Sequence, residues 1–427
     1  MKSLKTKILS IILSLSLTLP VLAVTGCSDA VTFRISNCED YIDEDLLDEF
    51  EDYYKEKTGV KIRVEYTTFG TLEELYTNMK RGDKYDLVCP SDYMVEKMAR
   101  EGMLKPLALD ANGTYNTTVS PFIKNTLEGV TWGENGEYSL ATYAAGYMWG
   151  TLGLVYNDAK IANKEDMKSW SSLWDSKYED KFTIKNSMRD TYFIGLAKHF
   201  KNELLSAKQS YAGGNITLSE YKSTLSTYFN NSNTSVISAV ESELLNLKAK
   251  SWGLEVDSGK NDIVLGNTDI YFAWSGDAVY AMDEAEEDGV TLKYEVPEEG
   301  SNVWFDGWCI PATSTNDEIS KEFIEFISCY DSVSRNMDYT GYVSCIAGSD
   351  VFDYVVDTYG AQNGEYSVDL GYFFGDGNYV VKTNELGRQF SAQYPAKEVI
   401  DRCVIMNYFN DTANEQISTM WTRISVA

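Results

Sequence analysis

The chain has 427 residues, of which 44% are hydrophobic and 24% charged, a composition ordinary for a globular protein and long enough for two domains. Its formal net charge of −28 would repel nucleic acid and anionic lipid and would attract cations. The chain has one histidine, His199. The composition therefore disfavours nucleic-acid binding, histidine-based metal sites and most histidine-based catalysis.

The first 26 residues are typical of a leader. Lysines at positions 2, 5 and 7 precede an apolar run over 8–24, and the run ends in Val-Thr-Gly before Cys27. This order resembles the lipobox of bacterial lipoproteins, in which cleavage precedes the cysteine and the cysteine is lipidated. The alternative is an uncleaved membrane helix. Either would place the folded part outside the cytoplasmic membrane.

The region 31–101 alternates between strand and helix patterns. We predict strands at 31–35, 60–66 and 85–89 and helices at 46–58, 72–81 and 95–101. This order predicts a mostly parallel sheet covered by helices, and such sheets bind ligands at the carboxyl ends of their strands. The loops 37–41 and 90–93 both follow predicted strands, so we expect them at a ligand site.

The rest of the chain continues the α/β pattern. Residues 143–157, YAAGYMWGTLGLVYN, form a strand-like run that we expect to cross into a second domain. Further strands are predicted at 182–184, 269–274, 292–296 and 304–310, helices at 191–205, 319–328 and 414–424, a helical hairpin at 206–228 and a loop at 338–344. Six scattered cysteines follow the leader without a CxxC pair, which disfavours zinc and leaves disulfide pairing open.

The stretch 303–311, VWFDGWCIP, is predicted to be a short strand. Because strand side chains alternate, Trp304, Asp306 and Trp308 should share one face. A buried carboxylate needs a partner, and indole rings beside a fixed negative charge suit an organic cation. The alternative is an aspartate that caps a loop beside core tryptophans.

Aromatic and acidic residues gather at the predicted strand ends, with one small hydroxyl and no lysine or arginine among them. They are Glu39, Tyr41, Ser91, Tyr93, Asp190, Trp274, Asp277, Trp304, Asp306 and Tyr342. Aromatic faces would hold the methylenes of a linear organic cation, and carboxylates would bind its ammonium groups. Several carboxylates at one empty site repel one another, so we expect affinity to depend on a multiply charged ligand.

These residues lie within motifs whose order resembles the spermidine/putrescine-binding proteins of bacterial ABC importers. The motifs are NCEDYIDEDLLDEFEDYYKEKTGVKI, YDLVCPSDYMVEKMAREGML, YMWGTLGLVYN, WSSLWDSKYEDKF, DIYFAWSGDA and VWFDGWCIPA. The resemblance covers most of the chain after the leader. It implies an α/β, two-lobed, periplasmic-binding-protein-like (type II) fold with a ligand cleft between the lobes. We expect one lobe to contain 30–143 and 306–347, and the other 144–305 and 348–427.

The resemblance also implies roles for the early site residues. Tyr41 matches the first-loop tyrosine, and Glu39 stands where the family usually has a small hydroxyl residue. Ser91 and Tyr93 match the pair of the second ligand loop, although Ser91 could instead be only a helix N-cap. Asp190 matches an acid that holds an amine.

The later site residues are matched in the same way. Trp274 and Trp304 match two aromatic walls, and Asp306 matches the acid that anchors an ammonium group. Asp277 matches an acid of the putrescine-preferring branch, and Tyr342 matches a late tyrosine.

Three positions depart from the family pattern. Cys38 stands where the family often has tryptophan, Ser187 where the spermidine-preferring branch often has aspartate, and Met406 near a family glutamine. Asp277 together with Ser187 leans slightly toward putrescine as the ligand.

The resemblance implies a polyamine receptor, anchored by lipid at Cys27 on the outer side of the bacterial cell membrane, that passes its ligand to an ABC permease. We expect no catalysis, cofactor, metal or nucleic-acid partner, and a monomer. One alternative is a receptor of the same fold for another solute, such as a sugar or a ferric complex, although paired tryptophans argue against iron. Another is a glycosidase that uses Asp190 and Asp306 as its two carboxylates.

Overall fold

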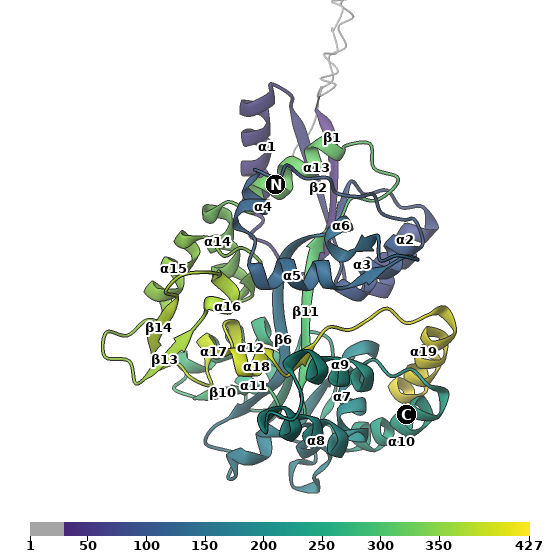
Figure 1. Cartoon of the computed structure of the whole chain (residues 1–427), viewed down its shortest axis with the longest axis vertical. Helices are drawn as coiled ribbons and strands as arrows, with labels where there is room; N and C mark the ends of the chain where they lie inside the picture. Colours follow the sequence, from purple (N-terminus) through teal and green to yellow (C-terminus); the bar gives the residue numbers. More distant parts are fainter. Residues whose placement is uncertain (1–29) are drawn as a thin grey trace, which may run out of the picture.

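The computed structural model describes residues 30–427, so the predicted leader and Cys27 lie outside the described residues. The chain forms two bodies stacked along the long axis of Figure 1, and two long strands run between them. These strands are β6 (Ala145–Asn157) and β11 (Ser301–Trp308), which pair antiparallel. Within residues 30–427, the helices fall short of the length and apolar character needed to span a bilayer. The exact lobe boundaries stay a prediction.

The upper body is built on a three-stranded parallel sheet in the order β2-β1-β3. Its first elements alternate as predicted and are β1 (Val31–Cys38), α1 (Asp45–Thr58), β2 (Ile62–Phe69), α2 (Leu72–Arg81), β3 (Leu87–Val88) and α3 (Asp92–Arg100). Helix α2 has the predicted bounds. Its first turn is capped by Thr71, whose hydroxyl accepts a hydrogen bond from the backbone N–H of Glu74 (3.2 Å), and Gly82 ends it with a φ of 104°.

Short elements and two longer helices complete the upper body. They are α4 (Thr114–Thr118), α5 (Pro121–Gly129), β4 (Thr131–Trp132), β5 (Tyr138–Ser139), α6 (Leu140–Tyr143), α13 (Asp317–Ile327), α14 (Tyr330–Thr340) and β12 (Val343–Ser344). The predicted loop at 338–344 is wrong at its start, because α14 continues to Thr340 and ends only where Gly341 adopts a φ of 72°.

The lower body contains most of a second sheet, in the order β15-β11-β6-β9-β7-β8, with β10 and β12 also paired to β6. The remaining strands are β7 (Phe182–Lys185), β8 (Gly253–Glu255), β9 (Ile270–Trp274), β10 (Leu292–Glu295) and β15 (Cys403–Val404). Strands β7 and β9 run parallel, so their carboxyl ends, Lys185 and Trp274, lie at the same edge.

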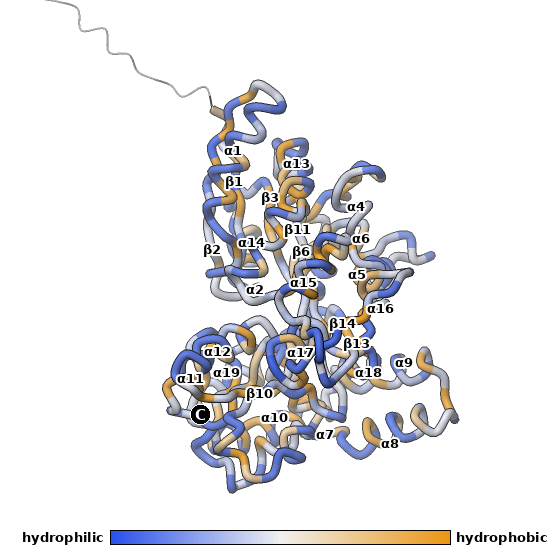
Figure 2. The backbone as a smooth tube through the Cα atoms, turned by 90° about the vertical axis from the view of Figure 1, so that its left-hand side faces the viewer, coloured by the Kyte–Doolittle hydropathy of each residue, from blue (hydrophilic) through white to orange (hydrophobic). Residues whose placement is uncertain are grey.

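Helices surround this sheet. They are α7 (Met188–His199), α8 (Lys201–Ala212), α9 (Leu218–Phe229), α10 (Thr234–Lys250), α11 (Gly259–Val264), α12 (Ser275–Glu287) and α19 (Asp411–Val426), with the 3-10 helices η1 (Lys164–Lys168), η2 (Trp170–Trp174) and η3 (Ser176–Tyr178). The predicted helix 191–205 is wrong as a single element. It breaks at Phe200, whose φ and ψ of −101° and 22° leave the helical range while its ring packs on Tyr228. Helices α8 and α9 project from the lower body (Figure 2).

The segment after β12 contacts both bodies. Its elements are α15 (Ser349–Tyr359), β13 (Tyr366–Asp369), α16 (Gly371–Phe374), β14 (Val380–Thr383), α17 (Gln389–Gln393) and α18 (Lys397–Ile400). Helix α15 contacts α14 and α16 contacts α5, whereas α17 contacts α12 of the lower body. The segment 349–400 therefore supplies a packed connection between the bodies.

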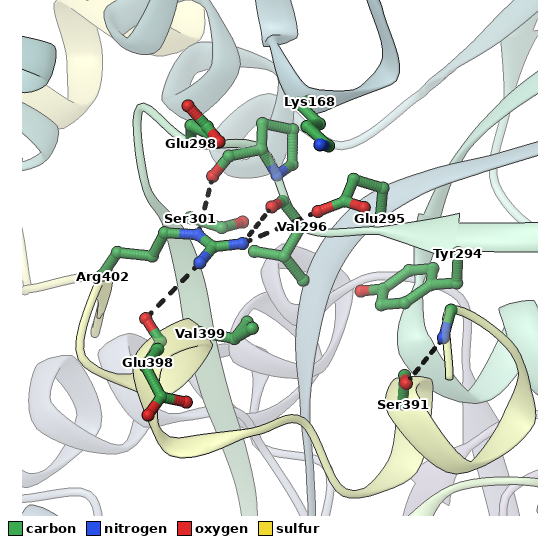
Figure 3. A network of polar contacts seen from close by, with 12 residues as sticks. Lys168, Tyr294, Glu295, Val296, Glu298, Ser301, Ser391, Glu398, Val399 and Arg402 are labelled. Atoms are coloured by element: carbon green, nitrogen blue, oxygen red, sulfur yellow. Dashed lines mark hydrogen bonds and ion pairs between the residues drawn. The ribbon is translucent and has the colours of Figure 1, made fainter. Parts of the chain in front are cut away.

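The start of β11 is held from the side by Arg402. Its guanidinium donates hydrogen bonds to the carbonyls of Val296 (2.7 Å), Pro297 (3.1 Å) and Glu398 (3.4 Å), as Figure 3 shows. These bonds tie the turn between β10 and β11 to the segment that leads into β15. The strand that carries Trp304 and Asp306 thus enters the junction from a fixed position.

Candidate functional site

Asp306 lies on β11 at the junction of the two bodies, where this strand meets the loop after β3. Ser91 forms a β-bridge with Asp306, and Ser91 Oγ donates a hydrogen bond to Asp306 Oδ1 (2.5 Å). Tyr41 Oη donates to Asp306 Oδ2 (2.6 Å). Burial raises the pKa of this carboxyl to about 6, against the opposing effect of the two hydroxyl donors, and the charge of Asp190 raises it further. Asp306 is therefore a buried acid held by neutral groups.

The second ligand loop presents its side chains in two directions. Ser91 occupies the N-cap position of α3, but its hydroxyl makes no capping bond and turns to Asp306 instead. Asp92 turns inward, is 3% exposed, and accepts hydrogen bonds from the backbone N–H groups of Tyr93 (2.6 Å) and Phe305 (3.4 Å). Burial raises the pKa of Asp92 well above its ordinary value. The loop therefore brings a second buried acid, Asp92, next to β11.

Asp277, in the first turn of α12, has a very different environment. Its carboxylate accepts hydrogen bonds from Tyr342 Oη (2.7 Å), Tyr271 Oη (2.8 Å) and Lys185 Nζ (3.1 Å). Burial alone would raise the pKa of Asp277, but the charges of Lys185 and Lys260 and the two tyrosine hydrogen bonds together outweigh it, and the pKa is lowered. The expectation of a site without a basic residue is wrong, because Lys185 reaches Asp277 from the neighbouring strand β7.

Aromatic rings connect the two aspartates. Tyr41 meets Tyr342 edge-to-face with ring centroids 5.1 Å apart, and Tyr342 meets Trp304 at 5.6 Å. Two glycines allow this packing: a Cβ at Gly276 would lie 2.2 Å from the Tyr342 ring, and one at Gly150 would lie 2.6 Å from Trp304. The three rings are each less than a tenth exposed. They form a continuous wall from Asp306 to Asp277.

Trp308 lies one layer behind this wall. Its ring packs on Tyr147 (4.8 Å between centroids) and on Phe323 (5.3 Å), and Tyr147 in turn packs on Tyr41 (5.6 Å). Of the two indoles in the stretch 303–311, Trp304 is therefore the one next to the acidic site, whereas Trp308 supports it from the core.

Asp190 and Trp274 approach from the lower body. Asp190 is 9% exposed, and burial raises its pKa while Ser187, Lys185, Arg189 and Trp274 lower it. Ser187 is the N-cap of α7, and its Oγ accepts a hydrogen bond from the Asp190 N–H (3.4 Å). Trp274 is half-buried at the end of β9. Asp190 also influences Asp306 electrostatically, so the two acids belong to one cluster.

Tyr93 and Arg189 stack across the junction. The Arg189 guanidinium lies 4.5 Å from the centroid of the Tyr93 ring and 4.0 Å from that of Phe409, and it donates to the Asn407 carbonyl (2.9 Å). This arginine is 4% exposed. It contacts neither Asp306 nor Asp277 through a hydrogen bond or ion pair among the described residues.

Three predicted positions lie farther from these contacts or differ in character. Glu39 is exposed in the turn after β1, and the described part of the chain gives it no hydrogen bond or ion pair. Met406 is 4% exposed within the hydrophobic core of the lower body. Cys38 is close enough for the charge of Asp306 to raise its thiol pKa, together with burial. Its thiol, like those of the other five cysteines in residues 30–427, is free. The ligand-binding roles of all these residues stay predictions.

Lys185, Asp92 and the direction of Arg189 are not predicted from the sequence. A weak signal exists for Lys185, since it directly follows the predicted strand 182–184 and ligands bind at the carboxyl ends of such strands. Burial of a lysine is rare, and nothing in the local pattern around residue 185 predicts it.

A separate cavity of about 420 Å³ lies behind the Tyr342 loop, between α12, α14, α15 and α17. Acidic side chains line part of it, namely Asp283, Glu286, Asp338 and Glu385. It does not include the residues predicted to bind ligand. The predicted residues around Asp306 and Tyr342 instead contact one another, so a ligand would have to separate some of these contacts to enter.

Two bodies joined by crossing strands, with acidic and aromatic side chains at the junction, define a two-lobed binding protein of the type II periplasmic class. The solved structure of a "Putative spermidine/putrescine ABC transporter" from Listeria monocytogenes has the same fold, with a TM-score of 0.65 at 21% identity over 92% of this chain and 99% of that one. The predicted fold class is confirmed.

Sequence comparisons then place the chain more closely. Residues 46–353 match the family described as bacterial extracellular solute-binding protein, and the chain belongs to this family. It is 24% identical to the "Spermidine/putrescine-binding periplasmic protein" of Salmonella typhimurium over 75% of this chain and 79% of that protein. It is 27% identical to the "Putrescine-binding periplasmic protein SpuD" of Pseudomonas aeruginosa over 74% and 78%.

Proposed function

We propose that this chain is a receptor that binds a polyamine and delivers it to an ABC importer in the membrane. The observation that carries the proposal is Asp306, a buried carboxyl held by two neutral hydroxyls beside the Tyr41, Trp304 and Tyr342 rings. An ammonium group of the ligand would give Asp306 a positively charged partner, and the ring faces would contact the attached methylenes. The printed names of the relatives in Salmonella and Pseudomonas point to the same class of ligand.

Ligand binding requires the two bodies to move relative to each other. Tyr41, Trp304, Asp306 and Tyr342 are each less than a tenth exposed, so solvent reaches them little in this arrangement. The bodies are joined by β6 and β11, and a hinge motion in these strands would open the junction. Closure around an amine would then bury the amine and present a surface for the permease to bind. The ligand favours this closed state because it binds the closed state more tightly than the open one.

Calorimetric titration tests this function. The chain from Ser28 to Ala427 retains every described element, so it is the form to titrate with putrescine, spermidine and spermine. We expect one-to-one binding of at least one of them. The matched control is Asp376→Asn, which removes an exposed carboxylate far along the chain from Asp306, and it should bind as the parent does. A folded protein that gives no heat with any of the three amines would contradict the proposal.

The membrane anchor and the absence of catalysis belong to the same proposal. Lipidation of Cys27 would hold the receptor at the outer face of the membrane, and mass spectrometry of the mature protein should find acyl chains on Cys27. As a non-catalytic monomer, the form from Ser28 to Ala427 should sediment as a single species with the mass of one chain and should not cleave glycans. An unmodified Cys27 in the mature protein, or glycan cleavage that depends on Asp190 and Asp306, would contradict these parts.

A further inference from the structure

The ammonium group of Lys185 is enclosed at the end of β7. The side chain is 0% exposed, and Nζ donates hydrogen bonds to Tyr271 Oη (2.6 Å), the Val256 carbonyl (3.0 Å) and Asp277 Oδ2 (3.1 Å). Glu255 Oε1 lies 3.4 Å from the same nitrogen. Because an ammonium group has three donors, Lys185 is fully satisfied here.

Aromatic faces complete the enclosure. Nζ of Lys185 lies 4.0 Å from the ring centroid of Trp274 and 4.8 Å from that of Tyr271. A carboxylate, a phenol and an indole face around one nitrogen are the groups that bind an organic ammonium ion. The region around Asp277 is therefore an ammonium site by its chemistry, and a residue of the chain itself occupies it.

The other end of the site is different. Among residues 30–427, no ion pair involves Asp306, which accepts hydrogen bonds from two neutral hydroxyls. Asp190 also has no ion pair there, although the charges of Lys185 and Arg189 are close enough to lower its pKa. Arg189, the nearest arginine in sequence, turns away to the Asn407 carbonyl. A second cation, Lys260, adds positive charge at the Asp277 end, where it is ion-paired with Asp257 (2.7 Å). Asp277 thus has a lysine directly bound to it and a second lysine nearby, whereas Asp306 has neutral partners.

We propose that Lys185 is a specificity-determining residue that occupies the ammonium subsite at Asp277 and restricts the receptor to short amines. The ammonium groups of such a ligand pair with Asp306 and Asp190 only. This inference rests on the proposed function and specifies its ligand. A longer triamine would place a third ammonium group against Lys185. Lys185 already occupies the Asp277 carboxylate and the Trp274 face, and its positive charge repels a second ammonium group. Asp277, which together with Ser187 leans slightly toward putrescine in the sequence, then binds Lys185 and not an amine of the ligand.

A matched pair of ligands tests the proposal on the unmodified protein. N-propylputrescine has the carbon skeleton of spermidine and its other two nitrogens, but it carries a hydrogen in place of the third ammonium group and is therefore one heavy atom shorter. If Lys185 occupies the subsite, calorimetry will find that spermidine binds less than tenfold tighter than N-propylputrescine, or more weakly. A spermidine advantage of tenfold or more would show that the third ammonium finds a free carboxylate, and the proposal would be overturned.

A variant tests the role of the lysine itself. Lys185→Met alone would leave two carboxylates buried without a partner, so it is combined with Glu255→Gln, which removes one of them. In the folded double variant, Asp277 becomes available, and the ratio of N-propylputrescine to spermidine dissociation constants should rise at least tenfold over that of the parent. Adding Asp277→Asn should abolish the rise. An unchanged ratio in the double variant would assign Lys185 a structural role only.

Failure of the inference can be told from failure of the proposed function. If putrescine, spermidine and N-propylputrescine all fail to bind the folded parent, both the function and the inference are overturned. If putrescine binds and spermidine exceeds N-propylputrescine by tenfold or more, the receptor function stands and only the role of Lys185 is removed.

Discussion

The two ends of the candidate site hold the same residue type in opposite electrostatic states. Asp306 accepts hydrogen bonds from two neutral hydroxyls, and burial raises its pKa to about 6. Asp277 accepts from Lys185 as well as from two tyrosines, and its pKa is lowered. Both are about 95% buried, so depth alone does not distinguish them. The difference is whether a cation of the chain is within reach.

This comparison shows which carboxyl is available to a ligand. At Asp277 the charge is already balanced within the fold, whereas at Asp306 balance is left to a proton or to a bound cation. Asp277 therefore has a role in stability and Asp306 a role in binding, although one continuous wall of aromatic rings connects the two residues. Changes at either end of the wall can weaken or strengthen this distinction.

Removal of Lys185 should destabilise the protein severely. Lys185→Met leaves Asp277 and Glu255 buried without their shared cation, and we expect the free energy of unfolding to fall by about 3–5 kcal/mol. Asp277→Asn leaves Lys185 paired with Glu255, so its loss should be smaller. Urea unfolding measures both losses. The double variant Lys185→Met/Asp277→Asn should regain part of the Lys185→Met loss, because Asp277 is then no longer a buried charge without a partner. An unpaired buried charge costs far more than about 1 kcal/mol. A loss below about 1 kcal/mol in both single variants would therefore show that Lys185 and Asp277 do not form a buried ion pair.

Asp306 should make the ligand-free protein less stable as the pH rises through the range in which this carboxyl loses its proton. Because its folded pKa of about 6 lies above the ordinary 3.8, the folded protein keeps a proton that the unfolded chain releases between these values. Stability of the ligand-free parent should therefore fall relative to Asp306→Asn as pH rises from about 4 to 6, by about 3 kcal/mol in all. Urea unfolding of both proteins at several pH values checks this. A parent that gains on the variant over this range would exclude the raised pKa.

Asp306→Asn should weaken amine binding by about 1.5–3 kcal/mol, the range for a hydrogen bond to a charged group. The same carboxyl should give the parent a pH profile in which affinity falls about tenfold per unit below pH 6, because the proton and the ammonium compete. Calorimetry at pH 5, 6 and 7.5 measures both effects. Equal affinity in a folded Asp306→Asn variant would remove this residue from the site.

Trp304→Ala should weaken binding by about 1–2 kcal/mol through the loss of its cation–π contact and ring face. Its indole packs on Tyr342, and its Nε1 is buried without a hydrogen-bond partner among the described residues. Trp304→Phe retains a ring and should lose less, which makes it the matched control. Parent-like affinity of Trp304→Ala would assign the residue to the scaffold.

Ser91→Ala should have the smallest effect. The change removes one donor to Asp306, so the carboxylate is less stabilised and its pKa should rise above about 6. At pH 7.5 the loss of affinity should be about 0.5–1.5 kcal/mol, with the midpoint of the pH profile shifted upward. An unshifted midpoint would mean that Ser91 acts only as the residue before α3.

Much of the fold could be predicted from local pattern. Helix α2 begins and ends where its capping threonine and its glycine stand in the sequence, and the strands and helices of 31–101 occur in the predicted order. The break at Phe200 could not be predicted, since helical residues stand on both sides of it and the ring contact with Tyr228 comes from a later helix. Local pattern fails where a partner distant in sequence decides the conformation.

The kinds of groups at the junction can be predicted from the sequence: carboxylates, tyrosines and tryptophans at strand ends, in an order that resembles a known class of receptor. Their charge states depend on the tertiary structure. Lys185 and Asp277 stand 92 positions apart and Tyr41 and Asp306 stand 265 apart, so neither pairing has a local signal. Folding places a cation against one aspartate and hydroxyls against the other, and in a buried, low-dielectric junction that difference in partner decides the charge of each.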